Sequence, residues 1–195
     1  VSAPILSTGA DFFSCDGGGD GYRSIGFIGS EGAVGTVRAE DGSTRYVYKT
    51  QIKGIGYAIG IREQQYCGAA GVQYIDGSHL LSGKDSRRIC DSLQNSDFAR
   101  ASHYSLQFYV VFYKIPTSNP MQEDNVNSQE QNAGMLVLQA GDNQSSASNV
   151  ATPMQLHLAS FTVRRTSCLV GTKSINVDMG TINKNEFHGI NSTAG

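Results

Sequence analysis

The sequence lacks long apolar runs and clusters of like charge, and each absence excludes a class of protein. No stretch approaches the roughly 18 apolar residues of a membrane-spanning helix, so we expect no membrane insertion. Charged residues make up 16% of the 195-residue chain, compared with about 25% in average soluble proteins. Lys and Arg do not cluster, and the formal net charge is −2, so nucleic acid is not an expected partner.

The sequence also lacks the spacings that metal sites and active sites require. It contains no Cys-x-x-Cys, no Cys/His pair at zinc-finger spacing and no EF-hand pattern, so we expect no metal and no cofactor. The four histidines are scattered, without a nucleophile elbow or clustered carboxylates. Asp76, Ser78 and His79 lie too close in sequence for a hydrolytic triad, because triads converge from distant segments. We therefore predict that the protein is not an enzyme.

The chain has four cysteines, Cys15, Cys67, Cys90 and Cys168, which allow three pairings. Cys67 and Cys90 flank one glycine-rich excursion, so we predict a disulfide between them. Such a bridge implies an oxidising compartment such as the periplasm or the cell surface. Cys15 and Cys168 are then the remaining pair, and the sequence does not settle whether they bond. No basic region precedes an apolar segment at the N-terminus, and the composition is that of an exported protein, so we expect that a secretory signal has been removed.

What is present is a series of short segments typical of β-strands. Segments rich in aromatic and β-branched residues, or apolar at alternate positions, are separated by Gly, Asp, Asn and Ser. We expect an all-β fold, an immunoglobulin-like or jelly-roll β-sandwich. The predicted strands are Tyr22–Ile28, Ala33–Ala39, Thr44–Thr50, Ile55–Ile61, His103–Ile115 and Met135–Leu138, followed by terminal strands around Leu156–Leu158 and Phe161–Val163.

Several details of these segments can be tested. Glu40–Ser43 is a predicted hairpin turn, because Asp-Gly supplies the positive φ that such turns require. His103–Ile115 is apolar on both faces after Leu106 and should be a central strand. Asp91–Ala101 is predicted as a short helix, and Thr117–Asn132 and Gly141–Asn149 as polar loops.

Two passages carry a resemblance to a known family. One is Tyr48-Lys49-Thr50 followed by Gly54-Ile55-Gly56. The other is the C-terminal series Ser167-Cys168-Leu169-Val170, Val177-Asp178-Met179-Gly180 and Phe187-His188-Gly189. The first resembles the receptor-binding domain, and the second the start of the pilin domain, of two-domain fimbrial tip adhesins assembled by a chaperone and an usher.

The resemblance implies a lectin-like receptor-binding domain in residues 1–165 and the first, incomplete part of a pilin domain in residues 166–195. A pilin domain lacks its last strand, and its open edge takes one from a periplasmic chaperone and then from the neighbouring pilin subunit. In that case the partner of Cys168 would lie outside this chain. The alternative is that the C-terminal segment adds one more hairpin to a single sandwich.

The same resemblance implies a protein at an extracellular fimbrial tip, exported through the periplasm, that binds a host glycan or glycoprotein receptor. Amide and carboxylate side chains recognise sugar hydroxyls in pairs, and an aromatic ring contacts the apolar side of the sugar. Three loops hold such residues, and the third matches a ligand-binding loop of the mannose-binding relatives by its position. The candidates are Gln65 and Tyr66, then Asp76, His79 and Asp85, and finally Asp142, Asn143, Gln144 and Asn149.

Three other functions are compatible with the same pattern. A structural minor fimbrial subunit or adaptor would have no polar pocket with an aromatic wall. An adhesin that recognises a matrix protein would present a broad exposed patch. A secreted carbohydrate-active enzyme would need two carboxylates about 5 to 10 Å apart across a cleft.

Overall fold

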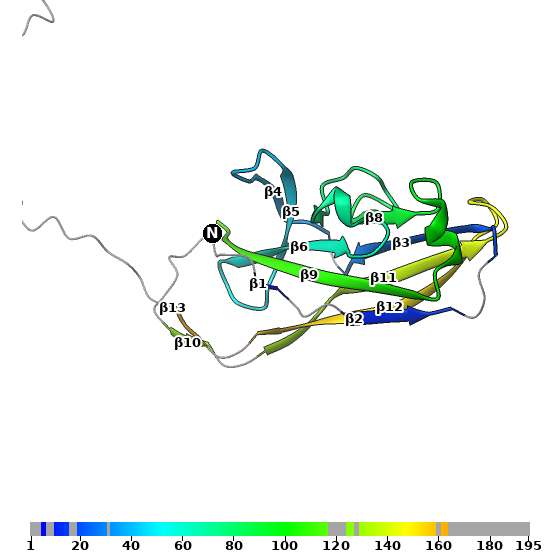
Figure 1. The fold of residues 1–195 in the computed structure, drawn as a ribbon. Coiled ribbons are helices and arrows are strands. Elements are labelled where there is room, and N and C mark those ends of the chain that lie inside the picture. Colours follow the sequence, from blue (N-terminus) through cyan, green and yellow to red (C-terminus); the bar gives the residue numbers. More distant parts are fainter. Residues whose placement is uncertain are drawn as a thin grey trace, which may run out of the picture. The chain divides into compact units, whose positions relative to one another are not determined.

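The computed structural model describes residues 5–6, 10–15, 19–30, 32–116, 124–126, 129–158 and 161–163. They form an all-β sandwich of two antiparallel sheets (Figure 1), which confirms the predicted fold class. All of them lie in the first of two units into which the chain divides, Val1–Arg164. The proposed pilin segment, residues 166–195, lies outside the described residues and stays a prediction. None of the helices in the described residues is long and apolar enough to cross a membrane.

The larger sheet is built around two long strands that pair with each other, β6 and β9. Among the described residues the sheet runs in the order β1-β9-β6-β5-β4, with β2 also paired to β9 and β7 to β6. β9 is therefore a central strand, as predicted. The strands of this larger sheet are β1 (Ile5–Leu6), β2 (Ala10–Ser14), β4 (Gly35–Arg38), β5 (Thr44–Lys49), β6 (Ile55–Glu63), β7 (Gln73–Tyr74) and β9 (His103–Lys114).

The smaller sheet runs in the order β12-β11-β3-β8 among the described residues. Its strands are β3 (Tyr22–Gly29), β8 (Ser86–Asp91), β11 (Gln129–Gly141) and β12 (Ser148–Leu158). A separate short pair joins β10 (Asp124–Val126) to β13 (Phe161–Val163). The short 3-10 helices are η1 (Gly68–Ala70) and η2 (Ser96–Arg100).

The core lies between the two sheets, because alternate residues of each strand point the same way. Ile25 and Phe27 of β3 belong to one buried cluster with the apolar residues of β6 and β9. The rings of Phe27 and Phe108 meet edge to face across the sandwich, with centroids 6.3 Å apart. Tyr57, Ile59 and Ile61 all belong to this cluster, so alternate residues of β6 face the core and the predicted strand is confirmed.

The outer face of the larger sheet carries a second apolar cluster, which explains why β9 is apolar on both faces. Val111 and Tyr113 of β9 pack there with Ala58 of β6, and with Val47 and Tyr74. The guanidinium of Arg45 lies 3.8 Å from the centre of the Tyr74 ring and covers part of this cluster.

Several sequence predictions are corrected by the strand boundaries. The predicted polar loop Thr117–Asn132 contains β10 and the first part of β11, which begins at Gln129. That part of β11 is polar and shows no apolar alternation. It is held by its pairing with β12, which runs from Gln129↔Leu158 to Asn132↔Gln155. β8 was not predicted, and only Ser96–Arg100 of the predicted helix Asp91–Ala101 is helical, as a 3-10 turn.

A bulge in β11 depends on Gly134, which has φ +149 and follows the register shift after Asn132. A Cβ at this position would lie 2.1 Å from the Ile28 carbonyl oxygen. We expect Gly134→Ala to lower the free energy of unfolding by about 2 kcal/mol through strain and displacement of the strand. Urea unfolding measures this, with Gly35→Ala as the control, because a Cβ at Gly35 would meet nothing within 4 Å. Equal stabilities of the two variants would contradict the prediction.

Candidate ligand-binding cleft

A cleft of about 410 Å³ opens at the end of the sandwich where β3 begins and where β8 and β11 end. It is lined by residues 20–22, by residues from the segment 92–100 and by residues 142–144. Figure 1 shows the loop after β11, in yellow, and η2, in green, at this same end. The cleft therefore combines three segments that are far apart in the sequence.

Two glycines allow these segments to come together. Tyr22 pairs with Gly141 at the end of the β3–β11 ladder, and a Cβ on Gly21 would lie 2.5 Å from the Gly141 carbonyl oxygen. A Cβ on Gly141 would in turn lie 2.7 Å from Ala147 Cα. The backbones approach so closely that both positions require a residue without a side chain.

The loop after β11 is closed by one of its own side chains. Asn143 Oδ1 accepts hydrogen bonds from the Ser145 amide at 3.0 Å, the Ser145 hydroxyl at 2.6 Å and the Ser146 amide at 3.0 Å. Asp142 and Gln144 are exposed and make no side-chain hydrogen bond with a described residue. Asn143 thus shapes the loop, and Asp142 and Gln144 are available to a ligand.

The wall opposite this loop is η2, and its start is fixed by Asn95. Asn95 Oδ1 accepts a hydrogen bond from the Asp97 amide at 3.0 Å and so caps the helix. Its Nδ2 donates to the Tyr66 carbonyl at 2.9 Å. The helix is thereby joined to the turn that follows β6.

The body of η2 is anchored in the core by Phe98, which is fully buried. Its ring packs on Tyr104 and Tyr66, with centroids 4.6 Å and 5.8 Å away. The Tyr104 hydroxyl donates to the Phe98 carbonyl at 3.1 Å, and Arg23 donates to the Ala101 carbonyl at 2.8 Å. A wall held in this way positions the cleft side chains on the outer surface of η2 with little freedom.

An ion pair joins two sides of the cleft. Arg100 donates from Nε and Nη2 to Asp20 Oδ1 at 3.0 Å and 2.5 Å. These hydrogen bonds, together with the charge of Asp20, raise the pKa of Arg100. Both side chains are exposed, so the pair contributes little to stability and can rearrange around a ligand.

Tyr22 is the one aromatic residue among the described residues that line the cleft, and it is only 4% exposed. Its hydroxyl is buried without a hydrogen-bond partner in the described part of the chain. A buried polar group without a partner costs about 1–3 kcal/mol. Leu93 supplies exposed apolar surface to the same cleft.

Gln65 and Tyr66, two of the predicted binding residues, belong to a turn held by the buried carboxylate of Glu63. Glu63 Oε1 accepts from the Gln65 amide at 3.0 Å, and Oε2 accepts from the amides of Tyr66 and Cys67, each at 2.6 Å. Tyr66 is engaged with Phe98 and Asn95, so its role is structural, and neither it nor Gln65 lines the cleft.

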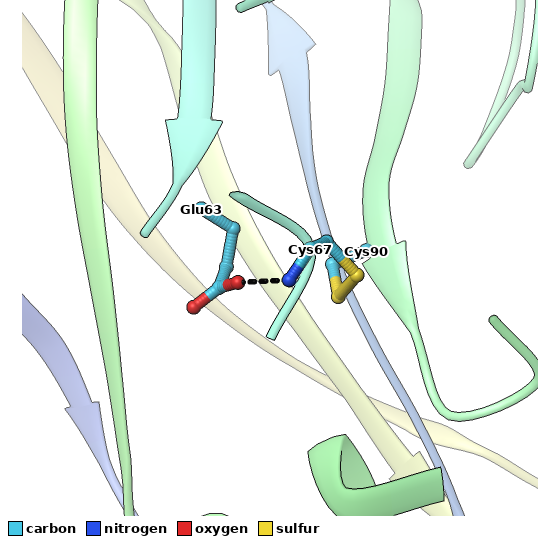
Figure 2. Close-up of side chains that lie close together, drawn as sticks. All are labelled: Glu63, Cys67 and Cys90. Carbon is cyan, nitrogen blue, oxygen red and sulfur yellow. Dashed lines mark hydrogen bonds between the residues drawn. A yellow bond between two sulfur atoms is a disulfide. The ribbon is translucent and has the colours of Figure 1, made fainter. Parts of the chain in front are cut away.

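The predicted disulfide Cys67–Cys90 is present, with Cα atoms 5.8 Å apart. Figure 2 shows it beside Glu63, whose carboxylate accepts a hydrogen bond from the Cys67 amide. The carboxylate and the two sulfurs lie within 4.8 Å of one another. The sulfurs are bonded to each other and are not thiolates, so this group does not fit a metal. Cys15 forms no disulfide with the other described cysteines, and Cys168 lies outside the described residues.

Asp76, His79 and Asp85 lie away from the cleft, because Asp85 precedes the start of β8 and the cleft follows its end. Asp76 accepts hydrogen bonds from the Ser78 amide and hydroxyl and pairs with Arg87. Burial alone would raise the pKa of Asp76, but these hydrogen bonds and the Arg87 charge hold it below its ordinary value.

Asp85 is also engaged inside the fold. Its Oδ1 accepts from the Ala33 amide at 3.0 Å and from the Tyr48 hydroxyl at 3.4 Å. Burial, followed by the charge of Asp85, raises the pKa of Tyr48. His79, the remaining predicted residue of this loop, is exposed and has a positive φ of 47°.

Of the predicted residues, the structure brings Asp142, Asn143 and Gln144 to the cleft. Asn149 Oδ1 instead accepts a hydrogen bond from Gln139 Nε2 at 3.1 Å. Sequence reasoning missed the rest of the cleft. The nearest signals were the polar side chains of the predicted short helix and the aspartate in the glycine-rich loop before β3. The missed residues are Asp20, Gly21, Tyr22, Ser92, Leu93, Ser96, Ala99 and Arg100.

Comparisons with known proteins give little beyond the fold. No family model matches the chain, and no curated protein matches it. Among solved structures, the chain is similar to the Proteus mirabilis Ambient Temperature Fimbriae adhesin AtfE, with 15% sequence identity and a TM-score of 0.48. The similarity covers 83% of this chain and 85% of that one. A similarity of this size assigns no function.

Proposed function

We propose that the chain is the receptor-binding part of a bacterial fimbrial tip adhesin and that it attaches to host cells or surfaces by binding a glycan in the cleft. The observation that carries this proposal is the exposed polar lining of the cleft. Asp142 and Gln144 face it without hydrogen bonds to the described residues, and Ser92 and Ser96 line its other side. A sugar ring presents adjacent hydroxyls that both donate and accept, which suits such a set of oxygens and amides.

Leu93 supplies the apolar part of the same site. Leu93 is 73% exposed and lines the cleft, so it can contact the C–H side of a sugar ring. Tyr22 also lines the cleft, but it is only 4% exposed and offers a ligand little surface. The apolar contact and the free polar groups thus belong to one cleft, as glycan recognition requires.

The position of the cleft also supports an adhesin. It lies beside the loop that precedes β12, and the chain leaves β12 at the other end towards Phe161. An 11-residue strand spans roughly 35 Å. The fimbrial adhesins that the sequence resembles bind their receptors at the pole remote from the pilin domain, and here the cleft lies at the end of β12 opposite to Leu158, its last residue.

The remaining partners and the localisation belong to the same proposal. Residues 166–195 would begin a pilin domain that pairs with a periplasmic chaperone and then with a neighbouring pilin subunit. The protein would act at the fimbrial tip, outside the cell. The Cys67–Cys90 disulfide is consistent with export through an oxidising compartment.

The alternatives differ from this proposal in measurable ways. The large apolar side chains with the greatest exposure come from separate segments of the described chain, and binding to a matrix protein therefore needs a direct test. They are Val34, Leu80, Leu93, Met135 and Val150. A structural subunit would have no use for an open polar cleft. Asp20 and Asp142 both line the cleft, so glycoside hydrolysis needs a direct test.

The experiment is a glycan-array screen of the 195-residue chain, followed by incubation with any bound glycan. We expect binding to a related set of glycans and no release of reducing sugar over a day. Release of sugar would identify an enzyme instead. Binding to an immobilised matrix protein without binding to any glycan would favour the protein adhesin.

A further inference from the structure

We infer that the cleft selects uncharged glycan ends and discriminates against acidic ones, such as those ending in sialic acid or sulfate. This inference rests on the proposed function and names the ligand class of the same site. The discrimination comes from Asp20 and Asp142, which line the cleft together with the one cation among its described residues, Arg100.

The charges that face the cleft are predominantly negative. Asp20 and Asp142 line it as carboxylates, and Asp97 lies close enough to act on the charge of Arg100. Arg100 is the only Lys, Arg or His among the described lining residues. An acidic ligand that enters therefore meets more carboxylates than cations.

The one guanidinium is already engaged. Two of its nitrogens donate to the same oxygen of Asp20, at 2.5 Å and 3.0 Å. A ligand carboxylate or sulfate either displaces Asp20, which then stays unpaired in a cleft that also holds Asp142, or binds the remaining N–H groups of a guanidinium whose charge Asp20 already offsets. The exchange replaces one anion by another and leaves an extra negative charge, so it offers no net electrostatic gain.

The same groups suit a neutral sugar. Hydroxyls of a sugar donate to carboxylate oxygens in charge-assisted hydrogen bonds, which are shorter and stronger than neutral ones. Asp142 and Gln144 are free to accept them, and Gln144, Ser92 and Ser96 can also donate. Carboxylates that repel an acid thus serve as acceptors for a neutral polyol.

The expected discrimination is modest, because the charges are exposed. Each exposed charge pair contributes little in water, so two carboxylates correspond to a difference of about three- to tenfold in dissociation constant at low salt. Salt should reduce the difference, since the Debye length falls from about 10 Å at 0.1 M to about 3 Å at 1 M.

The test compares neutral glycans with acidic derivatives of the same core: lactose with 3′-sialyllactose, and N-acetyllactosamine with its 6-sulfated form, together with the neutral glycans that bind best on the array and their sialylated or sulfated derivatives. Dissociation constants of the full chain are measured at about 50 mM and about 500 mM sodium chloride. We expect each neutral member to bind at least about threefold more tightly at low salt, and the gap to narrow at high salt.

Two variants locate the effect. Asp142→Asn should narrow the difference in dissociation constant between neutral and acidic glycans, because it removes a charge and keeps an acceptor. Asp20→Asn should narrow this difference further, because it frees Arg100. Glu40→Gln, in the exposed turn between β4 and β5, removes a carboxylate elsewhere and should leave the gap unchanged.

The outcomes separate this inference from the proposed function. Acidic members that bind as tightly as the neutral ones, or a gap that neither cleft variant changes, would overturn the inference and leave glycan binding intact. If no glycan of either kind binds, on the array or in solution, the proposed function fails and this inference fails with it. Because Asp20 and Asp142 are both exposed, thermal melts of the two variants should match the parent, and either variant alone is sufficient for the test.

Discussion

Replacing Glu63 by alanine is expected to lower the free energy of unfolding by about 3–5 kcal/mol, the largest effect of any single substitution proposed for this chain. Glu63 is fully buried and its carboxylate accepts three backbone amides, from Gln65, Tyr66 and Cys67. Its removal leaves these donors without an acceptor at a site where Cys67 is also buried. Each buried donor that loses its partner costs about 1–3 kcal/mol.

Urea unfolding of the purified chain measures this effect, with Gln65→Ala as the control because Gln65 belongs to the same turn and its side chain is exposed, without a hydrogen bond to the described residues. The loss of stability in Glu63→Gln should fall between those of Glu63→Ala and the control, since the new amide oxygen can accept hydrogen bonds but the new NH2 group faces donors. A loss below about 0.5 kcal/mol for Glu63→Ala would show that water replaces the carboxylate and that the turn does not depend on it.

The double variant Asp142→Ala/Gln144→Ala is expected to weaken glycan binding by at least about thirtyfold. Loss of hydrogen bonds to a charged and a neutral acceptor costs roughly 2 kcal/mol or more in total, and about 1.4 kcal/mol corresponds to tenfold in affinity. Both side chains are exposed and make no hydrogen bond with the described residues. The melting temperature should therefore stay within about 2 °C of the parent.

Calorimetric titration with the best glycan from the array, and a thermal melt of the same sample, provide the two readings. Gln65→Ala is the matched control, because Gln65 is an exposed amide that does not line the cleft. Asn143→Ala is a poor test of contact, since Asn143 closes its own loop. Unchanged affinity in the double variant would remove this loop from the binding site.

Much of the sandwich could be predicted from the sequence where apolar residues alternate. β6 could be predicted because Tyr57, Ile59 and Ile61 alternate along the strand and face the core, and β9 because it is apolar on both sides. The disulfide was predicted from two cysteines that flank one excursion. These signals survive in sequence because burial repeats with the period of the strand.

Other strands could not be predicted, because their partners determine them. β8 contains Arg87 and Arg88 in succession, and its register with β3 shifts between Ile25 and Gly26. Arg87 pairs with Asp76 through Nη1, and Arg88 Nη1 lies 3.7 Å from Asp91 Oδ2. Neither contact is visible as a pattern. The polar first part of β11 is likewise fixed by pairing with β12 and not by burial.

The cleft was only partly predictable for a related reason. A loop aspartate that serves a ligand looks the same in sequence as one that serves its own backbone. Asp76 bonds to Ser78 and Arg87, and Asp85 accepts hydrogen bonds from Ala33 and Tyr48. The side chain of Asp142 makes no such contact with the described residues. Asp20 and Arg100 reach the cleft only because η2 folds back against β3, which a sequence read alone does not show.

The most direct test of the central claim is an NMR titration of the isotope-labelled 195-residue chain with the glycan that binds best on the array. Glycan binding in the cleft predicts that the largest amide shifts fall in residues 20–22, 92–100 and 142–144, with little change in the β4–β5 hairpin. The largest shifts in that hairpin or around Asp76 and Asp85, with the cleft amides unmoved, would contradict it.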